Sequence, residues 1–264
     1  MKTFSLLAAA AAVLLPFAAP AHTPYLAPSE FAPGERATVA LDASFAETFF
    51  VPEVAFDGSR FEVTTPEGRS IAVDTVQVLK TRAVAEHALA GKGTYRFSTG
   101  HRLGAVFRTW EVDGKTASSR DPAQPLPAGA KMLSHFQSRT RAETYVTAGA
   151  PDQAALKPHG EGLELVAITH PGDLYAGERF ELEVRFDGRP MAGHKLEITE
   201  AVWSSDRTPG QSTLVTDAQG RASFDMAEAG TYLALVRHRA PAPAGAAAPE
   251  YSHSYTLSFR VLAQ

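Results

Sequence analysis

Apolar and polar residues alternate along most of this chain, in short runs that end at glycine or proline. The run Phe180–Phe186 places an apolar residue at every second position, with charged residues between them. The run Tyr251–Leu262 follows the same pattern, with serine, threonine and arginine in the alternate positions. A period of two residues is that of a β-strand with one buried face. Only Thr81–Leu89 is a candidate for a helix, so the sequence predicts an all-β fold.

The spacing of these runs predicts two domains. The 20 glycines and 18 prolines are spread between the runs as turn residues, which is the pattern of a β-sandwich. The alternation lapses at residues 149–160, where we expect a linker. We therefore predict two antiparallel β-sandwich domains of the immunoglobulin or transthyretin type, residues 22–148 and 161–264. Long loops are expected at residues 116–131 and 240–249.

The first 21 residues have the three parts of a secretory signal peptide. Lys2 supplies a positive charge, Phe4–Ala19 is almost wholly apolar, and Ala19-Pro20-Ala21 has the small residues of a cleavage site. The apolar run is shorter than the ~20 residues of a membrane-spanning helix, and no later stretch is longer. We expect cleavage after Ala21, which makes His22 the first residue of a periplasmic or secreted protein. An uncleaved anchor is the alternative.

Charge and cysteine content exclude several classes of site and partner. The formal net charge is −4, without a long run of like charges, so neither nucleic acid nor a membrane surface is an expected partner. The chain has no cysteine, which excludes disulfides, thiolate metal sites and iron–sulfur clusters. Its hydrophobic share of 44% is that of a globular protein, and the chain is long enough for a packed core that needs no disulfides.

Three segments of the second half resemble the transthyretin-like or carboxypeptidase-regulatory β-sandwich. They are Phe186–Gly193, Thr216–Phe224 and Ala229–His238, in which turns and glycines flank strands. The wider order, from His22 after the signal to a second sandwich that opens at Gly162–Val166, is similar to an uncharacterised periplasmic family grouped with the NikM component of nickel uptake. The resemblance implies a soluble, metal-associated periplasmic protein whose partner is an envelope transporter or receptor protein. Because the chain lacks the membrane spans of NikM transporters, it implies no transport channel.

His22 is the residue with the clearest chemical potential. At a free N-terminus, its α-amine and imidazole can together chelate a transition-metal ion, and nitrogen donors suit Ni, Co and Cu. Further histidines would complete the site, and we rank them His101, His135 and His253, at a strand end, in an irregular insertion and on the last strand. No H-x-H or H-E-x-x-H motif is present, so the site must be assembled across strands. The alternative is that His22 merely follows the cleavage site.

The sequence gives little support to catalysis. No G-x-S-x-G nucleophile motif occurs, and no catalytic residue is predicted. We therefore favour a non-enzymatic binding or accessory protein for a transition metal. The alternatives are a structural or adhesive module that binds a protein or glycan and, by analogy alone, a copper oxidase that uses His22 in a histidine brace. Arg139-Thr140-Arg141 could clamp an anion, although an exposed basic sheet edge has the same pattern.

Overall fold

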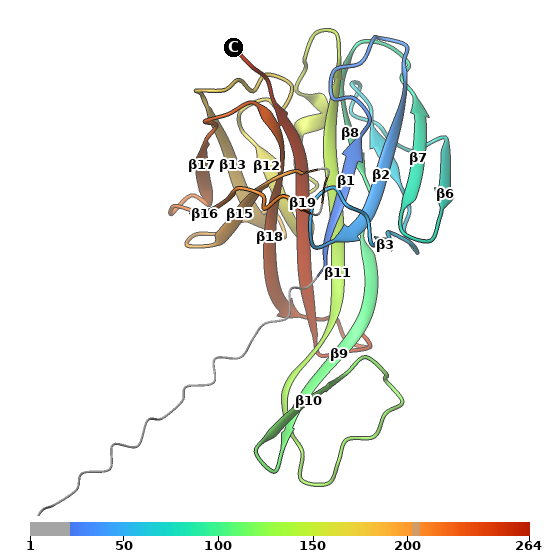
Figure 1. The fold of residues 1–264 in the computed structure, drawn as a ribbon, viewed down its shortest axis with the longest axis vertical. Coiled ribbons are helices and arrows are strands. Elements are labelled where there is room, and N and C mark those ends of the chain that lie inside the picture. The colour runs from blue at the N-terminus through green and yellow to red at the C-terminus, as the bar shows by residue number, and fades with distance from the viewer. Residues whose placement is uncertain (1–21, 203, 205) are drawn as a thin grey trace, which may run out of the picture.

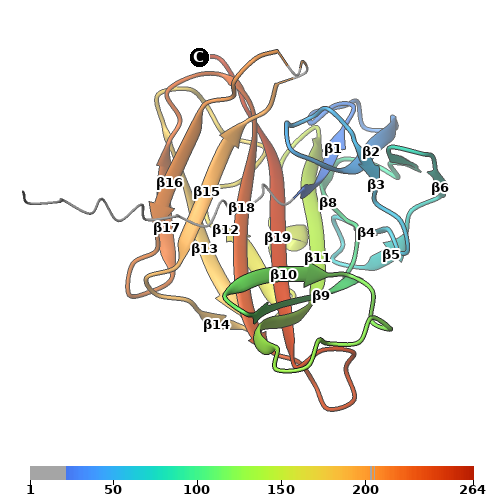
Figure 2. The ribbon, with the colours of Figure 1, turned by 60° about the horizontal axis from the view of Figure 1, so that its bottom comes forward.

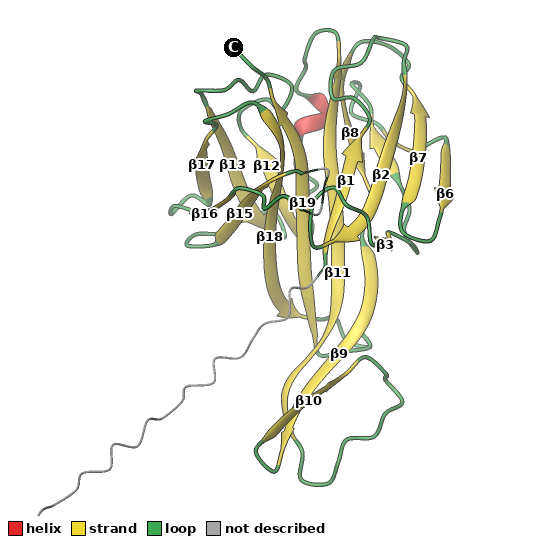
Figure 3. Cartoon of the chain, viewed as in Figure 1, coloured by secondary structure: helices red, strands yellow, loops and turns green. Residues whose placement is uncertain are grey.

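The fold is built almost wholly of β-strands (Figure 3). The computed structural model describes residues 22–202, 204 and 206–264, so the predicted signal peptide, residues 1–21, lies outside the described residues. Within the described part, one short 3₁₀ helix, η1 (Ala154–Leu156), accompanies the strands. None of the helices described there has the length and hydropathy needed to cross a membrane. The all-β prediction is confirmed.

The strands form three sheets (Figure 1). The first contains β1 (Thr23–Pro28), β2 (Thr38–Ala46), β3 (Val54–Ala55), β6 (Thr75–Val78) and β7 (Ala83–Ala88). The largest contains β4 (Glu62–Thr64), β5 (Ser70–Ala72), β8 (Gly93–Ser98), β9 (Arg102–Val112), β10 (Lys115–Ser119), β11 (Lys131–Ala148), β15 (Lys195–Glu200), β16 (Gln211–Val215), β18 (Gly230–Pro241) and β19 (Glu250–Val261). The third contains β12 (Leu163–Ala167), β13 (Arg179–Phe186), β14 (Arg189–Pro190) and β17 (Arg221–Asp225).

The order of the strands puts β11 and β19 at the centre of the molecule. The first sheet runs β1–β2–β7–β6 with β3 paired to β2, and the third runs β12–β13–β14 with β17 paired to β13. The largest runs β16–β15–β18–β19–β11–β8–β4–β5, and β9 pairs with both β10 and β11. Between the named strands of the described residues, every ladder is antiparallel except that of β11 with β19.

The alternation seen in the sequence appears as alternate burial. In β13, Phe180 and Leu182 are fully buried while Glu181 is exposed. In β19, Leu257 and Phe259 belong to the same core as these residues. A strand packed on one side must send successive side chains to opposite faces, so the sequence period is a direct consequence of this packing.

Two hydrophobic cores lie on opposite faces of the central strands. Ala142 and Val146 of β11 pack into a core that draws on residues 26–148. Tyr145, on the other face of β11, packs into a core that draws on residues 145–261. These two cores therefore divide close to the predicted linker, but a smaller third core joins the two halves, because Tyr25 and Phe50 pack there with Leu233. The largest sheet also continues across the linker through β11 and β19. The division into two domains stays a prediction.

Two local expectations are wrong. The helical candidate Thr81–Leu89 is the strand β7, paired with β2 and β6. Its alternate residues Ala83, Ala85 and His87 are buried, which is a period of two. The stretch after Lys131 is also one long strand, β11, instead of an irregular insertion. Two register shifts in its pairing with β9 interrupt its alternation, as β-bulges do.

A β-arm projects beyond the packed sheets (Figures 1 and 2). We define the arm as residues 106–136, which comprise the outer parts of β9 and β11 with β10. Phe107 and Phe136 stack within it, with ring centroids 5.0 Å apart. The guanidinium groups of Arg120 and Arg239 lie over these two rings, at 4.8 and 4.0 Å from the centroids.

Candidate functional site

The first site is the contact between His22 and Glu53. His22 directly precedes β1, and the pairing of Thr23 with Ala46 places it beside the end of β2. Glu53 lies in the return from β2 to β3, and its carboxylate is held by two contacts. Its Oε1 accepts a hydrogen bond of 2.8 Å from the backbone N–H of Glu47, and its Oε2 lies 2.8 Å from His22 Nε2. The His22 and Glu53 side chains are 41% and 37% exposed, so solvent reaches both.

This contact leaves one ring nitrogen of His22 for a metal ion. A carboxylate at Nε2 favours the tautomer with its proton on Nε2, which puts the lone pair on Nδ1. Nδ1 is also the ring nitrogen nearest the backbone, so only Nδ1 can close a small chelate ring with the α-amine of the same residue. Metal-ligating histidines commonly donate their second ring nitrogen to a carboxylate in this way. The geometry therefore fits a chelate at a free His22 terminus.

A groove of about 340 Å³ opens beside the start of β1. Its lining includes Thr23 and the carboxylate residues Glu47 and Glu197. Arg237 also lines it, donates a hydrogen bond of 2.9 Å to Thr23 Oγ1, and has an Nη1 atom 3.8 Å from Glu197 Oε2. Burial lowers the pKa of Arg237, while Glu197 opposes that shift. The two carboxylates favour the approach of a cation to this groove.

The structure separates the other predicted ligands from His22. Arg237 and His238 are consecutive in β18, so their side chains take opposite faces. Arg237 reaches Thr23, whereas the His238 ring contacts Phe186, with centroids 4.7 Å apart. His253 stands opposite His238 and also contacts Phe186, at 5.1 Å. His253 thus points away from His22.

His101 and His135 lie elsewhere again. His101 Nε2 is 3.4 Å from Glu161 Oε1. Glu161 lies just before β12, a strand of the third sheet. His135 is half-buried in the arm, opposite Arg108 of β9. Metal binding by these histidines stays a prediction, but the structure gives no shared site with His22. In the described chain, no group of three or more His, Asp or Glu side chains is placed to hold a metal ion.

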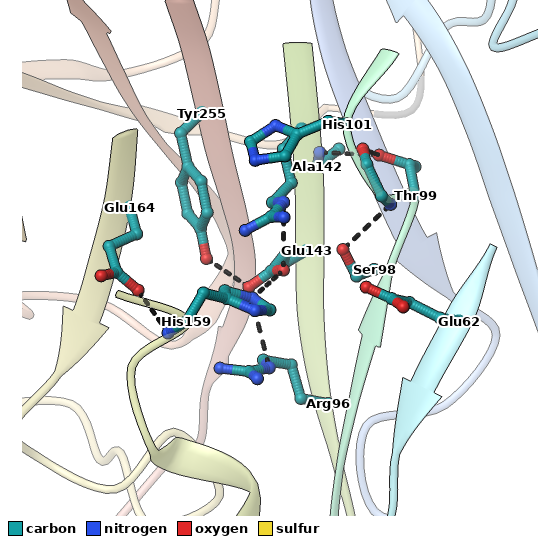
Figure 4. Close-up of polar contacts among 12 residues, drawn as sticks. Glu62, Arg96, Ser98, Thr99, His101, Ala142, Glu143, His159, Glu164 and Tyr255 are labelled. Atoms are coloured by element: carbon teal, nitrogen blue, oxygen red, sulfur yellow. Dashed lines mark hydrogen bonds and ion pairs between the residues drawn. The ribbon is translucent and has the colours of Figure 1, made fainter. Parts of the chain in front are cut away.

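A buried polar cluster around Glu143 is the second site (Figure 4). Glu143, on β11, is fully buried. Its Oε1 lies 2.7 Å from His159 Nε2, and its Oε2 accepts a hydrogen bond from Tyr255 Oη. Arg96 of β8 and Arg141 of β11 each place an Nε atom 4.0 Å from this carboxylate. Burial alone raises the pKa of the Glu143 carboxyl, but His159, Arg96 and Arg141 together hold it well below its usual range.

The Glu143 cluster ties the segment between the two cores to the central strands. Arg96 Nη1 donates to the carbonyl of Lys157 at 2.8 Å. The backbone N–H of His159 donates to Glu164 Oε2 at 2.7 Å, and Glu164 is itself buried. Our sequence analysis missed this cluster. The polar residues at every second position from Arg139 to Tyr145 were the available signal, because they had to share one face of a strand.

Comparison with known proteins gives a family. A model described as a domain of unknown function, DUF4198, matches residues 19–240. A search of curated proteins gave no match.

Solved structures give only distant likenesses. The D0–D1 domain of intimin is 12% identical, covers 89% of this chain and 96% of its own, and has a TM-score of 0.21. The FN1–FN3 domains of chicken CNTN1 are 7% identical, with 92% and 99% covered and a TM-score of 0.21. Three N-terminal domains of the bacteriophage RB49 outer capsid protein Hoc are 9% identical, with 91% and 99% covered and a TM-score of 0.20. At these scores the likenesses carry no argument. The family match extends over most of the chain, and the protein therefore belongs to the DUF4198 family.

Proposed function

We propose that the protein is a soluble, exported binding protein that holds a divalent transition-metal ion at its mature N-terminus. The observation that carries this proposal is the 2.8 Å contact between His22 Nε2 and Glu53 Oε2. It orients the imidazole so that Nδ1 and the α-amine can bind one ion, with solvent or a partner protein supplying the remaining ligands. The proposal depends on cleavage after Ala21 and on export to the periplasm or beyond.

The chemistry of the donors favours Cu²⁺ and Ni²⁺ over harder cations. Amine and imidazole nitrogens bind these two ions more strongly than they bind Co²⁺ or Mn²⁺. The resemblance of the motif order to the family grouped with NikM agrees with a metal-handling role. An exposed, partly coordinated ion suits transfer to or from an envelope transporter. We therefore propose an accessory role in metal handling, without catalysis.

Calorimetric titration with Cu²⁺ and with Ni²⁺ tests this proposal. Three forms are compared: the chain that starts at His22, its His22→Ala variant, and a chain that keeps a long histidine-free N-terminal extension. The extension must be long, because one added residue would supply a new amine and a coordinating amide nitrogen beside His22. We expect tight binding only in the first form.

His135→Ala is the matched control, because His135 is another solvent-accessible histidine outside the proposed chelate. It should bind each ion as the unmodified chain does. Equal affinity in the native, extended and His22→Ala forms would reject the metal site.

The arm favours a second function, the binding of a partner protein. Three large apolar side chains in it are exposed, Leu126, Met132 and Leu133, and clusters of exposed apolar residues mark interaction surfaces. The double variant Met132→Lys/Leu133→Lys should abolish cross-linking to a partner in periplasmic extract. Val215→Lys, at another exposed apolar position, should not. The same cross-linking pattern in both variants would remove this candidate.

A further inference from the structure

The Arg139-Thr140-Arg141 segment lies in the middle of the largest sheet. An exposed sheet edge was one expectation for it, and that expectation is wrong. β11 pairs with β19 on one side and with β8 and β9 on the other, so the segment has no exposed edge. Arg139, Arg141 and Glu143 are at every second position of the strand, so they share one face. Arg141 is only 4% exposed. A strand interior is a costly place for two arginines unless their charges are matched.

The buried donors of this face exceed its acceptors. Arg141 Nη2 lies 3.4 Å from Glu161 Oε1, but Arg141 Nε and Nη1 are buried without a hydrogen-bond partner. His101 Nε2 is also buried without one, although the same Glu161 oxygen lies 3.4 Å away. Buried polar atoms of this kind are rare and call for an explanation, such as a bound water or ion.

The nearest buried carboxylate is already occupied. Glu143 interacts with His159 and Tyr255 through its two oxygens, and it also faces Arg96. Glu161 is therefore a second carboxylate beside Arg141, whose Nε also lies 4.0 Å from Glu143, and it is the carboxylate that faces His101. Its side chain is 65% exposed, so it can swing into solvent at little cost. Figure 4 shows the His101 ring on the same side of β11 as the Glu143 cluster.

Two further observations place positive charge at this point. Gly162, which has a φ of 63°, lies against the side chains of His101 and Arg139. A Cβ at this position would be 3.1 Å from His101 Cε1 and 3.6 Å from Arg139 Nη1. Arg139 therefore reaches the same spot as His101 and Arg141. Burial is the main cause that lowers the pKa of His101 to about 3, and Arg141, Arg139 and His159 lower it further while Glu143 opposes them; burial and neighbouring positive charge both disfavour a protonated imidazole.

We propose that Arg139, Arg141 and His101 form a binding site for a small oxyanion, and that the Glu161 carboxylate takes the ligand's place when the site is closed. The ligand class is a carboxylate or phosphate group, because guanidinium donors match planar and tetrahedral oxyanions. Glu161 acts as an internal competitor for the arginines. This site lies on the opposite face of the sheet from His22 and does not depend on the metal proposal.

The experiment is calorimetric titration of the full mature chain with succinate and, separately, with inorganic phosphate, at constant ionic strength set by sodium chloride. Glu161→Gln removes the competing charge and should tighten binding of the preferred anion by about tenfold, which corresponds to ~1.4 kcal/mol. Arg139→Gln should weaken it by a similar factor. Arg141→Met should abolish it, but its burial makes this variant a test of folding as well.

Matched controls are Glu178→Gln and Arg189→Gln, which change charge at exposed positions in the third-sheet half of the molecule. Both should bind as the unmodified chain does. Succinate binding alone would assign the site to carboxylates, and phosphate binding alone would assign it to phosphates. The proposal is overturned if Glu161→Gln binds neither anion, or if the affinity is the same in Glu161→Gln, Arg139→Gln and the unmodified chain.

Discussion

Two histidine–glutamate pairs in this molecule have nearly the same geometry and opposite surroundings. His22 and Glu53 approach to 2.8 Å with side chains 41% and 37% exposed. His159 and Glu143 approach to 2.7 Å with side chains 16% and 0% exposed. Water competes for the first pair and screens it, so its net contribution to folding is small. Protein surrounds the second pair, so the loss of either partner leaves a buried polar group unmatched. Burial, more than contact distance, therefore decides what each pair does.

The largest expected difference is in stability. Glu143→Gln leaves the buried Arg96 without its ion-pair carboxylate and Arg141 with Glu161 alone, and we expect it to lower the free energy of unfolding by about 3–5 kcal/mol. Glu53→Gln should lower it by less than about 0.5 kcal/mol. Urea denaturation of both variants at neutral pH measures the two values. Equal losses would show that burial does not separate the pairs.

Acid should lower the free energy of unfolding through the histidines that are buried in the folded chain. Burial and then the charges of Arg141 and Arg139 lower the pKa of His101 to about 3. Burial, Arg139 and His238 lower that of His253 to about 4. Each histidine is neutral in the folded chain and gains a proton on unfolding below pH ~6.5, so acid favours the unfolded state. The free energy of unfolding should fall between pH ~6.5 and ~4, on the order of 2 kcal/mol for each histidine.

Urea denaturation across this pH range checks the prediction, with His101→Asn and His253→Asn as the informative variants. Each substitution should flatten the decline. Glu143 adds a separate loss at lower pH, because its folded pKa lies below its unfolded value, and its stabilising effect disappears as pH falls below that unfolded value. A decline with the same slope in both histidine variants would assign the acid sensitivity to other groups.

The exposed pair should show its effect in metal affinity. Glu53→Gln removes the carboxylate that orients His22, and loss of such a supporting partner costs roughly 10–100-fold in affinity. Calorimetric titration with Cu²⁺ measures this loss on the chain that starts at His22. Glu67→Gln is a suitable control, because Glu67 is an exposed glutamate whose side chain accepts a hydrogen bond from Thr65, away from His22. Unchanged affinity in Glu53→Gln would mean that the contact does not prepare the site.

The smallest expected effect concerns His135. It lies half-buried in the arm, opposite Arg108 and outside both pairs. His135→Ala should change the free energy of unfolding by no more than about 0.5 kcal/mol and should leave Cu²⁺ affinity unchanged. Denaturation and titration of this variant check both statements. A marked loss of affinity would show that His135 is a metal ligand.

Much of the fold was predictable because the period of two residues is a local property. The alternation in Phe180–Phe186 and Tyr251–Leu262 identified β13 and β19 correctly. Thr81–Leu89 misled because its strand β7 buries Ala83 and Ala85, and alanine is also typical of helices. The outer part of β11, around His135, was mistaken for an irregular insertion, since register shifts there break the alternation.

The sites were less predictable because they depend on which faces meet. The sequence identified His22 through the cleavage motif, but nothing local indicated that Glu53 would contact it from the return after β2. His101 and His253 were predicted to bind a metal together with His22, but nothing in the sequence indicated that both point toward the third sheet. The Glu143 cluster combines residues from β8, β11, β19 and the segment before β12. Only the parallel pairing of β11 with β19 brings Tyr255 to Glu143.

The central claim is that the exposed pair serves a ligand whereas the buried pair serves the fold. Electron paramagnetic resonance with one equivalent of Cu²⁺ tests it most directly, on the chain that starts at His22, the long-extended chain and the His159→Gln variant. The account predicts the same nitrogen-coordinated spectrum in the first chain and in His159→Gln, and its loss in the extended chain. An unchanged spectrum in the extended chain, or its loss in a folded His159→Gln protein, would contradict the account.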